Sequence, residues 1–88
     1  MNTPTKLFLD LFEVLNPDEV IRIELINGNN IYFLPSDEFY IDSPTIIILK
    51  QIKDKTQKII IDVNAIAVIC TMSRKTYEAK LKRGELYV

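Results

Sequence analysis

The chain contains no histidine and no tryptophan, and it has only one cysteine and two glycines among its 88 residues. Without histidine, neither a Ser-His nor a Cys-His nucleophile pair can form. A single cysteine permits no intramolecular disulfide and leaves a zinc site without a second thiolate. Two isolated glycines cannot build a glycine-rich phosphate loop. We therefore expect a non-enzymatic protein without a resident metal or cofactor.

Long apolar runs are also missing. No run approaches the roughly 18 residues that a membrane-spanning helix requires. The N-terminus carries acids within its apolar pattern, unlike the charged leader and clean apolar segment of an export signal. Cys70 lies inside an apolar run, which is typical of a buried thiol in a reducing compartment. We expect a cytoplasmic protein that does not contact a membrane.

The composition, with 48% hydrophobic and 26% charged residues, is typical of a globular chain, and the length suits one domain. The net charge of −1 conceals an uneven distribution. Residues 1–44 carry two bases and eight acids, whereas residues 45–88 carry nine bases and four acids. Such asymmetry is compatible with a basic surface for a polyanion, with complementary faces between copies, or with ordinary solvated surface.

Runs of β-branched residues predict strands, because these side chains fit a pleated surface better than a helix. An Asn27-Gly28 pair predicts a tight turn between the first two strands, since both residues tolerate positive φ. A polar turn over residues 53–57 is expected to join the next two. The predicted strands are Val20–Ile26, Ile31–Leu34, Thr45–Ile52, Lys58–Val63 and Ile66–Cys70.

Helical signals lie at both ends of the chain. Apolar residues spaced by three and four predict an amphipathic helix over Thr5–Leu15, with Thr3 as its cap and Pro4 in its first turn. Asp62–Ala65 suits a single helical turn between two strands. Residues 73–84 predict either a weak helix or a tail. The chain thus divides into a domain of residues 1–72 and a basic segment of residues 73–88.

The segment from Pro35 to Pro44 is expected to be a loop with an unusually apolar centre, formed by Phe39, Tyr40 and Ile41. Two interpretations remain open. These side chains either tuck back onto the core or are displayed for a partner protein.

The order of these elements resembles the Sm-like superfamily, and within it the bacterial Hfq branch. The similarity covers roughly residues 5–74. It is carried by the opening helix, by IRIELINGNNI from Ile21 to Ile31, by IIILKQ from Ile46 to Gln51, and by NAIAVI from Asn64 to Ile69 before Ser73-Arg74. The resemblance implies a mainly β fold, with an N-terminal helix followed by a strongly bent five-stranded antiparallel sheet or small barrel. It also implies a ring of copies that binds RNA.

The family's RNA-binding motif residues are not matched. Hfq-type members place Tyr-Lys-His before the Ala-Ile pair, where this chain has Asp62, Val63 and Asn64. A carboxylate at the first of these positions would repel phosphate near the pore of a ring. The aspartate, asparagine and Arg-Gly pattern of Sm-type members is also unmatched.

We therefore predict an oligomeric protein that binds single-stranded RNA, with a small protein-interaction module, partnered through Phe39, Tyr40 and Ile41, as the alternative. Recognition of single-stranded RNA requires stacking aromatics, hydrogen-bonding groups and cations. The candidate RNA-binding residues are Tyr40, Asn64, Lys50, Lys53, Lys55, Lys58, Arg74 and Lys75. The candidate contacts between copies are Ile59, Ile60, Ile61, Ile66 and Val68.

Overall fold

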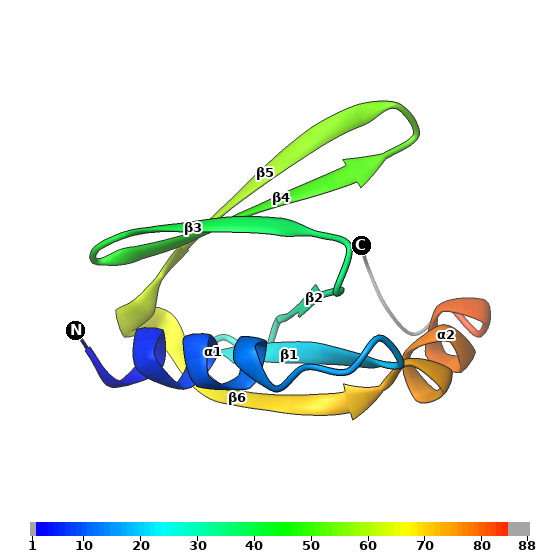
Figure 1. The fold of residues 1–88 in the computed structure, drawn as a ribbon, viewed down its shortest axis with the longest axis horizontal. Helices are drawn as coiled ribbons and strands as arrows, with labels where there is room; N and C mark the ends of the chain where they lie inside the picture. The colour runs from blue at the N-terminus through cyan, green and yellow to red at the C-terminus, as the bar shows by residue number, and fades with distance from the viewer. Residues whose placement is uncertain (1, 85–88) are drawn as a thin grey trace.

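A computed structural model describes residues 2–84 of the chain, and it contains two helices, six strands and one short 3-10 helix (Figure 1). The helices lie near the two ends of the described chain, and the strands lie between them. In chain order the elements are α1 (Thr3–Glu13), β1 (Glu19–Leu25), β2 (Asn30–Phe33), β3 (Glu38–Asp42), β4 (Thr45–Ile52), β5 (Lys55–Asp62), η1 (Val63–Ala65), β6 (Ile66–Ser73) and α2 (Arg74–Lys82).

The strands form two separate antiparallel sheets, and the prediction of one bent five-stranded sheet or barrel is wrong. The first sheet has the order β2-β1-β6, and the second has the order β3-β4-β5. We call them sheet A and sheet B. The segment of residues 35–44, which was expected to be a loop, contains a strand beyond the five predicted. This strand, β3, pairs along its whole length with β4. Its alternation of apolar and polar side chains accounts for the apolar centre of that segment.

The separation into two sheets has a local cause between β2 and β3. The amide of Asp37 donates to the carbonyl of Leu34 at 2.9 Å, and the amide of Leu34 donates to Oδ2 of Asp37 at 2.9 Å. These two bonds close a turn around Pro35, which has no N–H to donate to a strand partner. The chain therefore leaves sheet A after Phe33 and enters sheet B at Glu38 instead of continuing one bent strand.

Both predicted hairpins are confirmed, but their turns differ in detail. Gly28 supplies a positive φ of 89° in the first turn. The second turn is tighter than the polar segment 53–57 that was expected, because Ile52 already pairs with Lys55. Its two turn residues, Lys53 and Asp54, both take positive φ, at 48° and 66°.

The predicted helical segments are present. The helix α1 begins earlier than expected, and Asn2 is its cap in place of Thr3, with its Oδ1 accepting from the Thr5 amide at 2.9 Å. Asparagine satisfies an otherwise unpaired amide in the first turn. The single helical turn between the fourth and fifth predicted strands is η1. Of the two alternatives for residues 73–84, the helix is correct, and Ser73 caps α2 by accepting from the Thr76 amide.

One apolar core joins the two sheets and α1. Its fully enclosed members come from sheet A, from sheet B and from the helix, where Phe8 is 0% exposed. The ring of Phe8 meets the rings of Phe33 and Phe39 edge to face, with centroids 5.4 and 4.9 Å apart. Phe33 belongs to sheet A and Phe39 to sheet B, so the helix holds the two sheets together through aromatic contacts. The buried members of this core are Phe8, Ile21, Ile23, Phe33, Ile46, Ile48, Ile61 and Val63.

Shortening Phe8 should therefore destabilise the whole fold. We expect Phe8→Ala to lower the free energy of unfolding by about 3–5 kcal/mol, because it leaves a cavity where the two sheets and α1 meet. Leu7→Ala, on the exposed side of the same helix, should cost under about 1 kcal/mol. Urea unfolding followed by circular dichroism measures both variants. Equal losses would contradict the placement of Phe8 at the centre of the fold.

Candidate nucleic-acid interface

Three of the predicted RNA-binding lysines come together on the far half of the β4–β5 hairpin. Lys53, Lys55 and Lys58 are all exposed. In the described part of the chain, no ion pair involves any of them. The hairpin extends beyond the rest of sheet B in Figure 1, which leaves these cations accessible from several sides.

The helix α2 brings further cations to the same end of the molecule (Figure 1). Lys75 is exposed, while Nε of Arg74 lies 3.2 Å from Oε1 of Glu78, one helical turn away. Such an exposed pair contributes little stability, and the Arg74 side chain is 38% exposed. Lys80 and Lys82 occupy the last turn of the helix.

The opposite side of α2 holds the helix against sheet A. Tyr77 is 4% exposed and packs with Val20 and Tyr32, supported by partly buried apolar neighbours on sheet A and on the helix. The rings of Tyr32 and Tyr77 lie 5.2 Å apart. This small second core fixes α2 to the outer face of sheet A and directs its basic side toward solvent.

Lys50, in contrast, is not available to a ligand, and its assignment as an RNA-binding residue is wrong. Its side chain is buried and its Nζ lies 2.6 Å from Oδ2 of Asp37, whose side chain is also nearly enclosed. Without Asp37 the buried ammonium of Lys50 would have no partner, and an unpaired buried charge is strongly unfavourable. Lys50 therefore ties β4 to the turn between the sheets.

The remaining predicted RNA-binding residues are Tyr40, which lies one row from Lys58 on the same face of sheet B, and Asn64. Tyr40 is exposed on the outer face of sheet B, where strand alternation places Glu38 and Asp42 on the same side. These carboxylates would oppose a phosphate beside the ring. Asn64 lies in η1, at the opposite end of the molecule from α2 (Figure 1).

Phe39, Tyr40 and Ile41 do not form one displayed cluster. Phe39 and Ile41 pack against the main core, and only Tyr40 points outward. The strand alternation separates them: Phe39 and Ile41 tuck onto the core, while display for a partner protein stays a prediction for Tyr40 alone. A protein partner would reach Tyr40 but neither of its neighbours.

The residues predicted to join copies lie on two strands at the edges of the sheets. Within residues 2–84, β5 pairs only with β4 and β6 pairs only with β1, so each has one free edge. Ile60 and Val68 are exposed on these strands, whereas Ile59 and Ile66 are partly buried. Ile61 is 2% exposed within the core, which makes its assignment to an intermolecular contact wrong.

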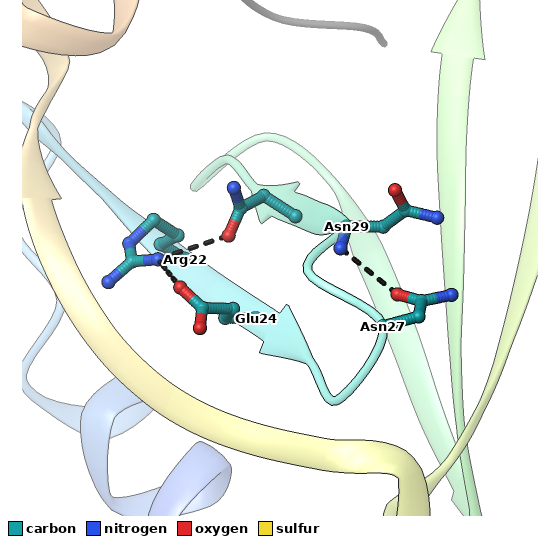
Figure 2. Close-up of polar contacts among 5 residues, drawn as sticks. Arg22, Glu24, Asn27 and Asn29 are labelled. Atoms are coloured by element: carbon teal, nitrogen blue, oxygen red, sulfur yellow. Dashed lines mark hydrogen bonds and ion pairs between the residues drawn. The ribbon is translucent and has the colours of Figure 1, made fainter.

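Sequence reasoning missed a polar cluster around Arg22 on the outer face of sheet A (Figure 2). Nη1 of Arg22 donates to Oε1 of Glu24 at 2.8 Å and to Oδ1 of Asn30 at 3.0 Å. The bond to Glu24 is the main reason that the pKa of Arg22 is raised. Strand alternation, which places Arg22 and Glu24 on one face, was the available signal. Both bonds come from the same nitrogen, and the bond to Asn30 links β1 to β2 near the Asn27–Asn29 turn.

Other kinds of site find no support in the described residues. Among residues 2–84, no three carboxylates or thiols gather in a way that would hold a metal ion. In the acidic segment before β4, Asp37 is already bonded to Lys50. Neither of the two helices in the described range is long and apolar enough to span a bilayer.

Comparison of the chain with protein-family models, with curated proteins and with solved structures finds no match. The proposed relation to the Sm-like superfamily therefore stays a prediction. Its element order, with a helix, an Asn-Gly hairpin, a long hairpin, a one-turn break and a last strand, is present. The sheet pairing that the resemblance implied is not.

The two buried tyrosines under α2 predict a loss of stability at alkaline pH. Burial raises the pKa of Tyr77, and the charge of Asp37 adds to the effect; burial also raises the pKa of Tyr32. In the unfolded chain both rings ionise near their ordinary pKa of about 10. The unfolded state thus loses these protons first, and stability that is complete below about pH 10 declines as pH rises through the folded pKa.

We expect Tyr77→Phe to flatten this decline, by up to about 1.4 kcal/mol per pH unit above pH 10. Urea unfolding at a series of pH values from neutral to alkaline measures how the free energy of unfolding declines. Tyr40→Phe is the matched control, since the ring of Tyr40 stays exposed. If both variants follow the unchanged protein, the ionisation of Tyr77 does not set the alkaline limit.

Proposed function

We propose that this chain is a non-catalytic protein that binds single-stranded RNA as an assembly of several copies. The supporting observation is the segregation of its cations. The basic hairpin turn and the basic helix α2 lie at one end of the long axis, while the start of α1, the β3–β4 turn and η1 lie at the other (Figure 1). A segregated positive field attracts a polyanion more strongly than the net charge of −1 suggests.

Acids also lie among these cations: Asp18 and Glu19 adjoin the start of α2, Glu38 lies in the same row as Lys58, and Asp54 lies in the hairpin turn. Two further acids are already paired. Asp37 is engaged by the buried Lys50, and Glu78 is engaged by Arg74. The lysines of the hairpin remain outside these pairs. Binding of phosphates there would release condensed counterions, which is the main source of sequence-independent affinity for nucleic acids.

Assembly is supported by the two free sheet edges. The strands β5 and β6 are eight residues long each, and a long unpaired edge is a template for pairing with another chain. Exposed Ile60 and Val68 provide apolar surface on these strands. Pairing of β5 of one copy with β6 of the next would place several basic ends in one assembly, which raises the affinity for a long strand through multivalency.

RNA binding should depend strongly on salt. We expect an unstructured uridine oligonucleotide to bind at about 50 mM salt, with a slope of log affinity against log salt near −0.7 for each neutralised phosphate, or roughly −2 to −4 in total. Fluorescence anisotropy over a salt series measures the slope. An absence of binding at low salt would contradict the RNA function.

The edge contacts can be tested by complementation. Ile60→Asp should block pairing through β5 and Val68→Asp pairing through β6, so that each variant alone is a monomer. An equimolar mixture should form a dimer and nothing larger, because one unaltered β5 and one unaltered β6 remain. Multi-angle light scattering gives the mass of each sample.

Ile26→Asp is the matched control, since Ile26 is exposed and apolar but lies in a turn outside both edge strands. It should assemble as the unchanged protein does. If Val68→Asp alone still dimerises, the copies pair through equivalent β5 edges. If the unchanged protein is a monomer, the assembly through these edges does not occur.

A second candidate function is protein binding through the outer face of sheet B. Exposed Tyr40 and Ile60 flank the buried Ile47 in one row across the sheet. Asp42 and Asp62 border this row on one side, and Glu38 and Lys58 border it on the other. Such a surface suits a partner with apolar and basic side chains. Under this function a protein should co-purify with the chain and be lost from Tyr40→Ser, while RNA affinity is absent.

A further inference from the structure

We propose that the far half of the β4–β5 hairpin, residues 51–58, is the arm that contacts the phosphates of the bound RNA strand, with Lys53 at its tip as a direct contact. This assignment rests on the proposed function and names the site within it. The arm is defined by three observations: its exposure, the arrangement of its cations, and the conformation of its turn.

The residues of the arm are not part of the apolar core. From Gln51 to Lys58 only Ile52 is partly buried, and every other residue is exposed. The ladder between the strands continues through this segment, with Gln51 opposite Thr56. Nε2 of Gln51 also donates to Oγ1 of Thr56 at 2.8 Å. The arm is therefore a regular two-stranded ribbon that projects into solvent (Figure 1).

The cations surround the ribbon. Lys55 and Lys58 are three residues apart on one strand, so their side chains leave opposite faces of it. Lys53 lies in the turn between them and β4. Asp54 is the one acid within residues 51–58. A ribbon with positive charge on both faces and at the tip can follow a flexible phosphate backbone without reading its bases.

The backbone conformation of the turn is unfavourable for one of its two residues, Lys53. Lys53 takes a φ of 48° and Asp54 a φ of 66°, in a two-residue turn. Side chains other than glycine, asparagine and aspartate rarely adopt this conformation, because Cβ crowds the backbone. The first hairpin of the same chain has Gly28 at its positive φ. A lysine in such a position lowers the stability of the turn and exposes an ammonium at the outermost point of the arm, which indicates a contact with a ligand.

On β4 the arm ends beside Lys50, while on β5 it reaches Lys58, which pairs with Leu49 one position further toward the core. The buried pair of Lys50 with Asp37 anchors the ribbon to the turn between the sheets. The three cations of the arm, Lys53, Lys55 and Lys58, are all exposed to solvent. The helix α2 lies at the same end of the molecule (Figure 1).

The test replaces the three lysines of the arm together, as Lys53→Gln, Lys55→Gln and Lys58→Gln. With the uridine oligonucleotide as probe, we expect the affinity at about 50 mM salt to fall at least tenfold and the salt slope to become shallower by about 2. The matched control lowers the net charge equally at the other end of the molecule, through Asn27→Asp, Asn29→Asp and Lys6→Gln. It should change affinity less than about threefold.

A single substitution separates contact from stability. Lys53→Asn should raise the midpoint of urea unfolding, because asparagine tolerates positive φ, and should lower RNA affinity about fivefold. Loss of affinity without a gain in stability would still support the arm but contradict the role assigned to the turn.

The outcomes distinguish this proposal from the function on which it rests. If the unchanged protein binds RNA and the triple variant binds equally well, the arm is not the contact and the RNA function stands. If the triple variant and its control lose affinity equally, only net charge matters and the arm is excluded. If the unchanged protein binds no RNA, both proposals fail.

Discussion

The carboxylate of Asp37 is the interaction on which the arrangement of this protein depends. One of its oxygens accepts from the amide of Leu34 and from Nζ of Lys50. The first bond closes the turn that divides sheet A from sheet B, and the second holds the long hairpin to that turn. A buried ion pair adds little stability over an apolar pair of the same shape, but loss of either partner leaves an uncompensated charge. The pair therefore specifies where the two sheets part.

The same ion pair shows that Lys50 serves the fold and is not part of the exposed basic surface. The chain has nine bases after residue 44, and their distribution alone does not reveal which of them serve the fold. Burial assigns Lys50 to the structure, and Arg74 is partly occupied by Glu78. The lysines of the hairpin turn and of α2 remain. The charge left exposed on the hairpin turn and on α2 is thus a consequence of how the core is closed.

The two-sheet architecture also determines which surfaces are free. Splitting the strands into three and three creates four sheet edges. Two of them belong to β2 and β3, which are short, and two belong to the eight-residue strands β5 and β6. Long edges favour pairing with another chain more than short ones do. The helix, the two hairpins, the one-turn break and the last strand follow the order expected from the sequence, while the pairing of strands is decided by the turn at Asp37.

The sequence by itself determined the elements that depend on local patterns. Apolar spacing predicted α1, the Asn27-Gly28 pair predicted the first hairpin, and runs of isoleucine predicted β4, β5 and β6, because dihedral preferences and side-chain periodicity act over a few residues. Only the tertiary structure decided that residues 38–42 form a strand and that Lys50 and Ile61 are buried. The strand β3 pairs with the next strand across a short turn, and Phe39 and Tyr40 face opposite ways by strand alternation. The burial of Lys50 and Ile61 depends instead on which residues distant in the chain come into contact. Such contacts are fixed by burial and hydrogen bonding across the whole fold, and no short stretch of sequence encodes them.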